Sequence, residues 1–516
     1  MSPASPIRDA DGMGRWIERH AERAGARLAL EDDRRRLDYA ALHARILRAV
    51  DVLHASGVRR GERVAILARN RSAVLEVVFA AARLGAIAVP INARLVAREI
   101  RFLFGDCTPR AALFDAASEP AVREAAAALG AAAPALLACG GDDDAWERAL
   151  AAAAPREACE PCAAETPTLL MYTSGTTGEP KGALLPERKA LANCRNAEIF
   201  FGLGPEDRVL VALPLFHSFG LQILSLPTLY AGGRVVLRRA FDPAAVWADV
   251  ERHGITFLGG VPTMFRALLE ALAAAPRPPD LRSLRFLFTA GAAIGVDLIR
   301  GFEARGLVLK QGFGQTETSI LCCLDARDAI RKAGSVGRPV AHAEVRVVRR
   351  ATLGRPPARW EDVAPGEAGE IVVRGPIAML GYWRRPAETA EVLRGGWLRT
   401  GDVATLDAEG FLTLVGRARD LYISGGENVY PAEVEAVYAE HPAVREIAVV
   451  GVPDPEWGEV GCAYVVPEPG AALDAEALRA WGRERLAAFK LPREFVALAE
   501  LPRTETGKVQ KHRLPR

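Results

Sequence analysis

The sequence predicts an α/β protein with a large N-terminal domain of βαβ-built sheets flanked by helices and a small, mobile α+β C-terminal domain. From about residue 60 onward, continuous apolar runs alternate with amphipathic segments of helical length, which is typical of buried parallel strands joined by helices. The 516 residues, half of them apolar, suffice for large cores. A charged junction followed by new periodicities predicts domains of residues 1–418 and 419–516.

The elements of the N-terminal domain follow from the period of the apolar residues. Continuous apolar runs predict strands, which we place at residues 64–67, 86–91, 111–114, 168–171, 208–213, 234–237, 257–261, 285–289, 307–310 and 369–375. Apolar residues at helical spacing predict helices, which we place at residues 72–84, 97–104, 243–252, 262–273 and 296–305. Residues 117–165 carry no motif and predict a helix with a surface loop, and residues 351–368 predict a surface excursion.

The C-terminal domain has shorter elements of its own. Residues 407–411 (Asp-Ala-Glu-Gly-Phe) predict a hairpin turn just before the boundary. Beyond the boundary, helices are predicted at residues 431–440 and 474–489, and strands at residues 447–452 and 462–467. A unit of about 100 residues is an ordinary size for a small domain.

Charge and composition exclude several classes of partner. The net charge of +2, from 66 basic and 64 acidic residues, argues against a nucleic acid or an anionic membrane as the main partner. Residues 1–25 lack the apolar core of a signal peptide, and the apolar residues 77–90 are too few to span a bilayer. Cys159 and Cys162 form an isolated C-x-x-C, for which a proline-flanked loop is favoured over a metal or redox site. We therefore expect a cytoplasmic protein without an integral membrane segment.

Residues 172–182, Tyr-Thr-Ser-Gly-Thr-Thr-Gly-Glu-Pro-Lys-Gly, predict a phosphate cradle directly after a strand. Glycines let the backbone approach a polyanion, hydroxyl groups add donors, and Lys181 supplies a mobile positive charge. The spacing differs from that of the common P-loop. A flexible linker is the alternative, but such linkers rarely sit tight against a strand. The residues expected to line this phosphate cradle are Thr173, Ser174, Gly175, Thr176, Thr177, Gly178 and Lys181.

This cradle resembles the signature of the adenylate-forming enzymes, which include acyl-CoA synthetases, aryl-CoA ligases, luciferases and peptide-synthetase adenylation domains. Later motifs extend the resemblance across nearly the whole chain. It implies two half-reactions: a carboxylate and MgATP give an acyl-adenylate and pyrophosphate, and coenzyme A then gives a thioester and AMP. One departure follows the cradle, where residues 184–189 (Leu-Leu-Pro-Glu-Arg-Lys) replace the commoner Thr/Ser-His-Arg-Asn, so the start of the next helix is unusual.

Residues 311–318 resemble the family's Gly-Tyr-Gly-x-Thr-Glu motif. The resemblance implies that Phe313 stacks on adenine, that Thr316 contacts phosphate and that Glu317 binds Mg²⁺, for which one protein carboxylate is enough. Phe313 replaces the usual Tyr, which keeps the stacking surface but loses a phenol hydrogen bond. A turn with a core Phe is the alternative. Further ATP contacts are expected from Gln311, Gly312 and Gly314.

Three further polar residues match the nucleotide site of the family. Asp402, in Thr-Gly-Asp, resembles the ribose ligand, since a carboxylate can accept from two vicinal hydroxyls. Arg417 resembles the ribose and phosphate contact, and Asn428 stands where relatives place a polar ATP contact. Alone, each would more often be a solvated surface residue. Their spacing within the family pattern favours the functional interpretation.

The end of the chain resembles the family's mobile lid. Lys508 matches the catalytic C-terminal lysine, which stabilises the negative charge that builds up when a carboxylate attacks the α-phosphate. Arg419 matches the hinge residue, and Gly425 and Gly426 match the loop that lines the coenzyme A tunnel. A rotating lid separates the two steps, because one site cannot hold the pyrophosphate donors and a thiol tunnel at once.

The acyl pocket is expected near residues 217–223, 257–265, 291–293 and 315–321. The resemblance implies that His217 borders this pocket and orients or gates the carboxylate, although a lone His on an apolar stretch is more often a core residue. The other pocket residues named are Phe219, Gly291, Ala292 and Gly312. These segments offer no carboxylate to bind the ammonium group of an amino acid, which argues against an amino-acid substrate. They also offer no evident Lys or Arg apart from Arg266, so a dicarboxylate is less favoured.

We therefore predict an acid–CoA ligase of fatty acid metabolism or a related pathway, acting on a fatty, medium-chain or aryl monocarboxylate. Its expected partners are this acid, ATP and coenzyme A, and a homodimer is left open. One alternative is an acyl-AMP ligase that loads a carrier protein. The other is a nucleotide-binding protein without catalysis, against which the combination of Lys508, Glu317 and Asp402 weighs.

Overall fold

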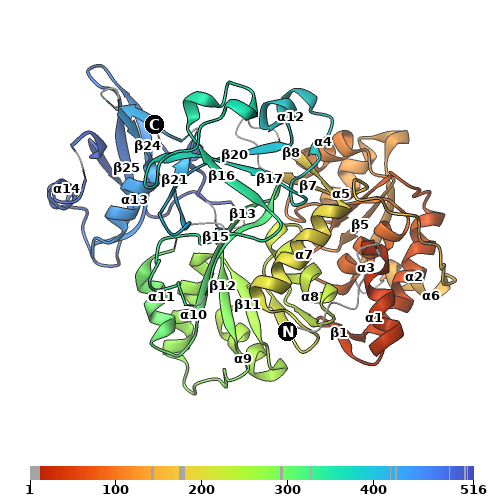
Figure 1. Cartoon of the computed structure of the whole chain (residues 1–516). Helices are drawn as coiled ribbons and strands as arrows, with labels where there is room; N and C mark the ends of the chain where they lie inside the picture. Colours follow the sequence, from red (N-terminus) through yellow and green to blue (C-terminus); the bar gives the residue numbers. More distant parts are fainter. Residues whose placement is uncertain are drawn as a thin grey trace.

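The computed structural model describes residues 12–140, 144–173, 180–290, 294–325, 327–418, 420–424, 427–486, 488–504, 507 and 509–515, with Glu427 and Asn428 described through their backbone only. In these ranges the strands form sheets of seven, nine, five and five strands (Figure 1). Three of the sheets belong to the N-terminal part and the fourth to the C-terminal end. No helix within the described ranges is both long and apolar enough to cross a membrane.

The seven-stranded sheet carries the cradle. In spatial order its strands are β18 (Gly381–Tyr382), β8 (Lys181–Pro186), β7 (Pro167–Thr173), β4 (Ile87–Pro90), β3 (Arg63–Leu67), β5 (Ala111–Asp115) and β6 (Ala135–Cys139). The strands from β7 to β6 run parallel, whereas β8 and β18 are antiparallel to their neighbours. The helices along this part of the chain are α3 (Ser72–Arg83), α4 (Ala97–Cys107), α5 (Glu119–Ala127) and α6 (Ala145–Ala152).

The nine-stranded sheet carries the predicted adenine segment. In spatial order its strands are β15 (Arg338–Pro339), β14 (Ser319–Leu324), β13 (Leu309–Gln315), β12 (Phe286–Thr289), β11 (Phe257–Gly260), β9 (Arg208–Val211), β10 (Arg234–Leu237), β1 (Leu28–Glu31) and β2 (Arg36–Asp38). The strands from β13 to β1 are parallel. The helices between them are α9 (Pro243–His253), α10 (Pro262–Ala274) and α11 (Val296–Glu303).

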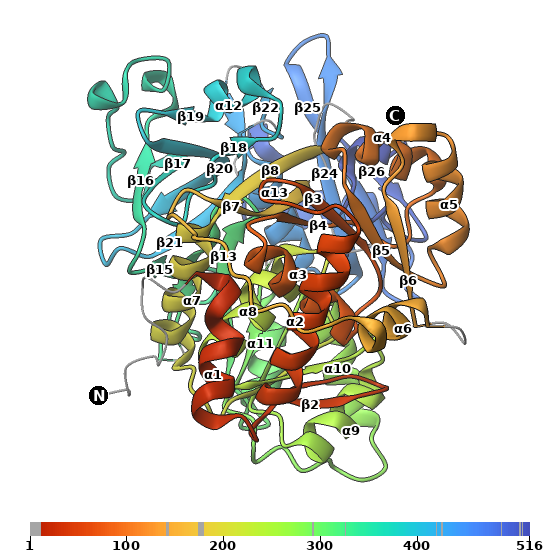
Figure 2. The ribbon, with the colours of Figure 1, turned by 90° about the vertical axis from the view of Figure 1, so that its right-hand side faces the viewer.

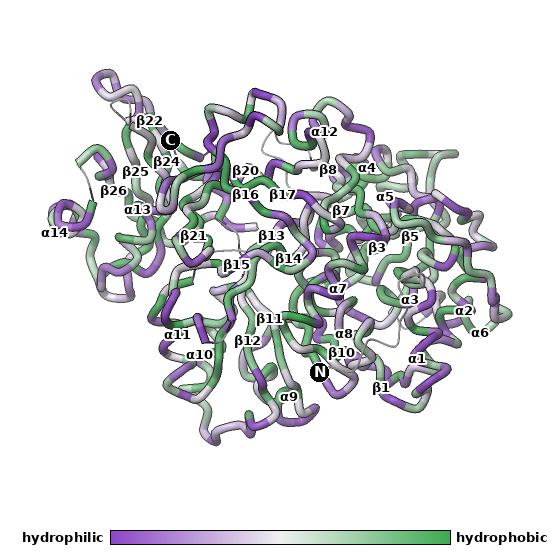
Figure 3. Tube along the Cα trace, viewed as in Figure 1, coloured by the Kyte–Doolittle hydropathy of each residue, from purple (hydrophilic) through white to green (hydrophobic). Residues whose placement is uncertain are grey.

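One continuous core joins these two sheets. It contains side chains of both sheets and of α3, together with buried residues of the helices that follow the cradle. Those helices are α7 (Glu187–Phe201), the π-helix η3 (Phe219–Ser225) and α8 (Leu226–Tyr230). Figure 2 shows α2 (Tyr39–Ala55) beside α1 (Trp16–Ala24) and α3, and Figure 3 shows largely apolar trace along β11 and β12. The buried helices therefore fix the two sheets relative to each other.

The third sheet is antiparallel and carries the predicted ribose ligand. Its strands are β16 (Glu344–Val348), β17 (Ala368–Arg374), β20 (Trp397–Leu406), β19 (Leu393–Arg394) and β21 (Leu412–Arg417), with α12 (Pro386–Val392) beside them. The predicted hairpin turn at residues 407–411 joins β20 to β21. Short 3-10 helices along the described chain are η1 (Met13–Arg15), η2 (Gly130–Ala132), η4 (Arg350–Thr352), η5 (Pro357–Arg359), η6 (Ala488–Lys490) and η7 (Lys511–Arg513).

The fourth sheet forms the C-terminal domain. Its strands are β23 (Glu427–Val429), β22 (Tyr422–Ser424), β25 (Gly458–Pro467), β24 (Val444–Asp454) and β26 (Glu494–Ala497), and its helices are α13 (Pro431–Ala439) and α14 (Ala475–Arg483). Tyr422, Tyr438, Val449 and Leu478 belong to a core cluster of this part alone. The predicted fold class, a large domain with parallel sheets and a small α+β C-terminal domain, is confirmed.

Three sequence predictions about elements differ from the structure. Residues 135–139 form the strand β6, which the sequence hid because alanine gives no clear period in this segment. The strand expected at residues 307–310 instead runs from Leu309 to Gln315, since residues 311–315 pair with β14. The helix expected at residues 474–489 ends at Arg483, and the chain turns into η6.

Candidate active site

The two ends of the cradle lie side by side in the seven-stranded sheet. β7 ends at Thr173 and β8 begins at Lys181; the two residues are register partners, and Thr173 Oγ1 donates to the Lys181 carbonyl oxygen at 3.3 Å. The sequence predicted the strand before the cradle but not the antiparallel strand after it. The predicted phosphate contacts that lie outside the described residues are Ser174, Gly175, Thr176, Thr177 and Gly178.

Tyr382 connects the cradle to the predicted metal ligand. It lies in β18, and Lys181 Nζ is 5.7 Å from the centroid of its ring. The Tyr382 hydroxyl donates to Glu317 Oε1 at 3.0 Å, and the Met379 N–H donates to the Glu317 carbonyl oxygen at 2.9 Å. Lys181, the predicted phosphate contact, and Glu317, the predicted metal ligand, therefore both contact Tyr382. Sequence analysis missed Tyr382, whose signal is the triplet Gly-Tyr-Trp at residues 381–383.

The carboxylate of Glu317 fits a magnesium ion. Mg²⁺ prefers oxygen ligands and usually takes one or two from protein carboxylates, with water and substrate phosphates completing its shell. Glu317 lies in the turn between β13 and β14, half-buried, on the same side as the cradle lysine. Among the described residues, no group of three or more His, Cys, Asp and Glu side chains is arranged to hold a metal. The donor set therefore matches an ion that arrives with a nucleotide.

The glycines of the adenine segment are required by close packing between β13 and its neighbours. A Cβ on Gly314 would lie 1.8 Å from the Ser319 carbonyl oxygen, and one on Gly312 would lie 2.5 Å from Phe288 Cζ. Phe313 is half-buried and packs against the large core from its place opposite Cys322. The segment is thus a strand in which the Phe313 ring is half-buried, and Thr316 follows in the turn.

Two neighbouring polar side chains, one at the carboxyl end of β12 and one within β13, have unused hydrogen-bonding groups. Thr289 of β12 and Gln311 of β13 are register partners, and both are buried. The Thr289 Oγ1 and Gln311 Nε2 atoms have no hydrogen-bond partner within the described part of the chain. Buried polar groups are normally paired, so such atoms mark places where a ligand can bind. Gln311 was predicted as an ATP contact, whereas Thr289 was missed.

Asp402 is held from two sides. Arg417 lies opposite it in the β20–β21 ladder, with Nε 2.7 Å from Asp402 Oδ1. Gln315 of β13 donates from Nε2 to the other carboxylate oxygen and to the Thr400 carbonyl oxygen at 2.8 Å. The carboxylate is buried, so these donors define its orientation. The structure brings both predicted ribose residues together and adds Gln315, which the sequence placed only in a segment expected near the acyl pocket.

His217 lies two residues before the π-helix η3. The Phe219 N–H lies 3.3 Å from His217 Nδ1, so this hydrogen bond ties the ring to its own turn. The Phe219 ring meets the Phe288 ring edge-on at 5.7 Å, and Phe288 also packs against Gly312. Two of the predicted pocket residues, Phe219 and Gly312, are therefore brought together around Phe288, and His217 lies in the turn just before Phe219. Gly291 and Ala292 lie outside the described residues.

The C-terminal site residues are described only in part. Those outside the described residues are Lys508, Arg419, Gly425 and Gly426, and Asn428 is described through its backbone alone in the β22–β23 hairpin. Gly507, which precedes Lys508, is described. A Cβ on it would lie 3.3 Å from Thr263 Oγ1 and 3.7 Å from Val261 Cγ2. Val261 and Thr263 stand at the start of α10, so the end of the chain contacts the segment predicted to line the acyl pocket.

Comparison with known proteins identifies the family. The family model described as AMP-binding enzyme matches residues 17–383, and the one described as AMP-binding enzyme C-terminal domain matches residues 433–508. This chain belongs to the AMP-binding enzyme family. The resemblance to adenylate-forming enzymes that the cradle predicted is thereby confirmed.

Curated relatives of this AMP-binding enzyme align along nearly its whole length. A feruloyl-CoA synthase of Amycolatopsis sp is 43% identical over 503 residues, covering 97% of this chain and 98% of the relative. An indoleacetate–CoA ligase of Aromatoleum aromaticum is 41% identical over 512 residues, covering 97% and 96%. Among solved structures, ATP-bound MatB from Rhodopseudomonas palustris has a TM-score of 0.88 and 30% identity, covering 97% of each chain. MenE from Bacillus subtilis, in complex with ATP and magnesium ion, has a TM-score of 0.85 and 33% identity, covering 97% and 99%.

The AMP-binding enzyme also contains a buried polar cluster that sequence analysis did not place. Lys189 of α7, which stands in the unusual segment after the cradle, is fully buried. Its ammonium group donates to Gln222 Oε1 at 3.0 Å and to the Ser319 hydroxyl. Burial lowers the pKa of Lys189 to about 7, although the nearby Glu317 carboxylate acts in the opposite direction. The cluster lies between the His217 segment and the Glu317 turn.

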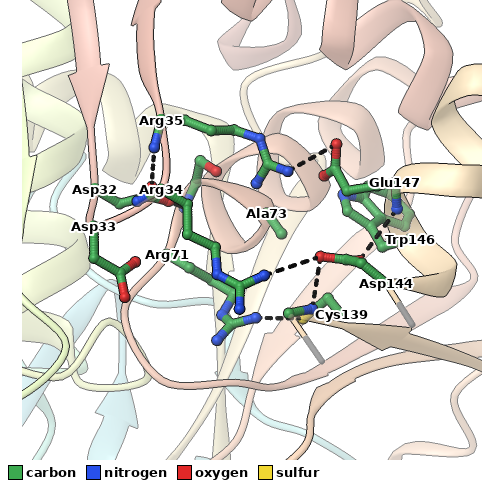
Figure 4. A pocket seen from close by; sticks show the side chains of 12 residues that line it. Asp32, Asp33, Arg34, Arg35, Arg71, Ala73, Cys139, Asp144, Trp146 and Glu147 are labelled. Carbon is green, nitrogen blue, oxygen red and sulfur yellow. Dashed lines mark hydrogen bonds and ion pairs between the residues drawn. The ribbon is translucent and has the colours of Figure 1, made fainter. Parts of the chain in front are cut away.

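Figure 4 shows a second group of charged side chains, around a small hollow of this AMP-binding enzyme. The hollow lies between the β1–β2 loop, the start of α3 and the start of α6, and these elements carry none of the predicted site residues. Arg34 pairs with Asp144 at 3.8 Å, and Arg35 pairs with Glu147 at 2.9 Å. The charges are joined to one another, so the hollow is a junction that holds the β1–β2 loop against α6.

Proposed function

We propose that the protein is an ATP-dependent acid–CoA ligase, which forms an acyl-adenylate and then an acyl-CoA thioester. The observation that carries this proposal is the meeting of three sheets at one site: Lys181 from the first, Glu317 from the second and Asp402 from the third. A cation, a metal-binding carboxylate and a diol-binding carboxylate are what a bound MgATP requires. The two curated relatives given above are named as a CoA synthase and a CoA ligase, which supports the second half-reaction.

In the first half-reaction a carboxylate oxygen of the acid attacks the α-phosphorus of ATP. A new O–P bond forms, the bond from phosphorus to the bridging oxygen breaks, and pyrophosphate leaves with its electron pair. Lys181 and the cradle hold the phosphates, and Asp402 with Arg417 holds the ribose. Mg²⁺ at Glu317, when bound, neutralises phosphate charge. Lys508 is assigned the positive charge at the α-phosphate, where electrostatic stabilisation contributes most.

In the second half-reaction the thiol of coenzyme A attacks the acyl carbon. A C–S bond forms, the C–O bond to phosphate breaks, and AMP leaves. We assign residues 1–418 and 419–516 as the two moving units, with Arg419 as the hinge and Gly425 and Gly426 at the thiol tunnel. The contact of Gly507 with the start of α10 supports a lid that closes over the acyl pocket. Rotation of the lid then withdraws Lys508 and admits the thiol.

The acid is proposed to be an aryl monocarboxylate. The Phe219 and Phe288 rings, both buried, lie edge to face beside Gly312 and close to His217, so the segment predicted to line the acyl pocket packs on aromatic side chains. The 43% and 41% identical relatives are named for feruloyl and indoleacetate groups, both aromatic. Fatty and medium-chain acids, which the sequence left open, are the comparison class, since a 34% identical relative of Mycobacterium tuberculosis is named as a long-chain ligase.

A panel of carboxylic acids tests the proposal. Purified protein is incubated with MgATP and each acid, and pyrophosphate release and thioester formation with coenzyme A are measured separately. We expect arylpropenoic and arylacetic acids to give the highest kcat/KM, by about fivefold over fatty acids, because an aromatic contact contributes on the order of 1 kcal/mol beyond its buried area. Preference for a fatty acid would overturn the substrate class. Absence of acid-dependent pyrophosphate release would overturn the function.

A further inference from the structure

Lys189 is a buried amine that the family pattern does not predict. It lies in the first turn of α7 with none of its surface exposed, at the position where the commoner motif after the cradle ends in Asn. Burying an ammonium group costs free energy unless the group is hydrogen-bonded, so the stability of the fold depends on the partners of Lys189. Those partners are Gln222, 3.0 Å from Nζ, and the hydroxyl of Ser319.

The first partner belongs to the acyl side of the site. Gln222 lies in the π-helix η3, which begins at Phe219, and its Nε2 donates to Ser218 Oγ at 3.1 Å. Ser218 adjoins His217. A π-helical turn is an irregular form that occurs mostly at functional sites. Lys189 is therefore linked through Gln222 to the residues that carry His217 and Phe219.

The second partner belongs to the phosphate and metal side. Ser319 is the first residue of β14, two positions after Glu317, and its hydroxyl lies 3.2 Å from Gln222 Oε1. Its φ of +57° is a left-handed conformation that favours glycine. A residue held in such a conformation needs support from its surroundings. The hydrogen bond from Lys189 supplies that support and fixes the turn that bears Glu317.

Asn193, one turn further along α7, repeats the same connection. Its Nδ2 donates to the Gln222 carbonyl oxygen at 2.5 Å, and its Oδ1 accepts from the Ile320 N–H at 3.3 Å. Two successive turns of one helix thus each contact η3 and the start of β14. All five side chains that make these contacts are buried: Lys189, Asn193, Ser218, Gln222 and Ser319.

We propose that Lys189 is a positioning residue for adenylate formation, which holds the His217 segment and the Glu317 turn at a fixed separation. The inference rests on the proposed function. The carboxylate oxygen, oriented on the His217 side, has to meet the α-phosphorus of the nucleotide held on the Glu317 side before the O–P bond forms and pyrophosphate leaves. A small misplacement of reacting groups slows such a step strongly. Thioester formation starts after pyrophosphate has left, so it depends less on the Glu317 turn.

The test compares Lys189→Met and Ser319→Gly with wild type. Adenylate formation is measured as single-turnover pyrophosphate release, and thioester formation is measured from saturating, supplied acyl-adenylate. We expect the first rate to fall by about 30- to 100-fold in Lys189→Met, the scale of a misaligned reacting pair, with the second changed by less than about threefold. Ser319→Gly suits the left-handed backbone and removes the acceptor, so we expect an intact fold and a selective loss of adenylation.

A binding measurement supplies a readout without turnover or metal. A stable acyl-sulfamoyl adenosine spans the acyl and nucleotide sites at once, whereas AMP fills only the nucleotide site. By titration calorimetry we expect Lys189→Met to lose about tenfold or more in affinity for the analogue, because the acyl and nucleotide sites no longer lie at the separation that the analogue spans. The affinity for AMP should fall by less than about threefold. Equal losses for both ligands would show a general structural role and overturn the proposal.

Arg83→Met is the matched control. Arg83 is also a buried basic residue, but it pairs with Glu18 at 2.9 Å, away from the site. We expect it to lower the melting temperature while both half-reactions keep their ratio. If Lys189→Met behaves as this control does, or if Ser319→Gly leaves adenylation unchanged, the positioning role of Lys189 is overturned and the proposed function stands. A wild type inactive with every acid would instead overturn the proposed function and this role with it.

Discussion

Gln315 and Asp402, which lie in different sheets, are joined by a hydrogen bond from the Gln315 side-chain amide to the Asp402 carboxylate. The same amide donates to the Thr400 carbonyl oxygen at 2.8 Å. Gln315 thereby ties the end of β13, next to the Glu317 turn, to the strand that carries the proposed ribose ligand. The third sheet is positioned on the nine-stranded sheet through this side chain. The nucleotide site therefore depends on a contact that neither segment specifies by itself.

Replacing Gln315 by Leu should weaken nucleotide binding more than it slows chemistry. The variant removes a charge-assisted hydrogen bond, worth about 1.5–3 kcal/mol, that orients the Asp402 carboxylate. We expect the KM for ATP to rise by roughly 10-fold or more on that scale, with the KM for the acid within about twofold, as measured by pyrophosphate release. Asp407→Asn, in the exposed hairpin turn after the same strand, is the control and should leave both constants unchanged. An unchanged KM for ATP in Gln315→Leu would contradict the assignment.

Tyr382→Phe should change the magnesium requirement. The hydroxyl donates to Glu317 Oε1 at 3.0 Å, and its loss frees the proposed metal ligand to rotate. Hydrogen bonds that orient a metal-binding carboxylate are worth about 10- to 100-fold in metal affinity. We expect the Mg²⁺ concentration for half-maximal pyrophosphate release to rise by about tenfold on this scale, while saturating Mg²⁺ restores most of the rate. The same Mg²⁺ dependence in Tyr382→Phe and wild type would show that Glu317 does not need this partner.

The sequence predicted those parts of the site that a single segment encodes. The cradle, the Phe313–Glu317 stretch, Asp402 and Arg417 are each recognisable from a few neighbouring residues, and the structure brings the described ones together. Tyr382 and the contact of Gln315 with Asp402 were missed because both roles come from partners far away in the chain. A tyrosine or a glutamine is a common residue, and only folding shows that it meets a functional carboxylate.

The fold shows the same division. Parallel strands such as β10 and β12 were predictable because a strand buried on both faces is a continuous apolar run. β8 and β6 were not, since the first begins with Lys and Gly and the second lies in an alanine-rich stretch. From the sequence, Lys189 was recognisable only as part of an unusual helix start at residues 184–189. Its burial against two distant segments follows from how the sheets pack around α7, which the local pattern does not contain.

Lys508→Ala should separate the two half-reactions. The neighbouring Gly507 contacts the start of α10, so the end of the chain reaches the acyl-pocket segment. Removing a cation that stabilises developing charge at the α-phosphate costs about 100- to 1,000-fold in rate. We expect pyrophosphate release to fall by about this factor, with thioester formation from supplied acyl-adenylate largely kept. Lys511→Ala is the control, because Lys511 Nζ lies 2.6 Å from Glu435 Oε1 and is assigned no role. Equal loss of both steps in Lys508→Ala would rule out the assignment.

The stability of the protein should depend on pH through Lys189. Burial lowers the pKa of this amine from 10.5 to about 7, so between these values the unfolded chain binds more protons than the folded one. Stability therefore rises with pH across this window, and the penalty for burying the charged form is fully present only below about pH 7. A difference of this kind is worth up to about 1.4 kcal/mol for each pH unit.

The free energy of unfolding, measured by denaturant titration of wild type and Lys189→Met at pH 7 and pH 9, tests this dependence. We expect wild type to gain about 1–3 kcal/mol relative to the variant between the two values. Burial also raises the pKa of the Cys322 thiol and the Tyr422 phenol, which lowers stability in alkali, but both proteins share these groups and their effect cancels in the difference. Parallel pH profiles would mean that the Lys189 ammonium keeps its proton in the folded protein, because its hydrogen bonds to Gln222 and Ser319 outweigh the loss of hydration.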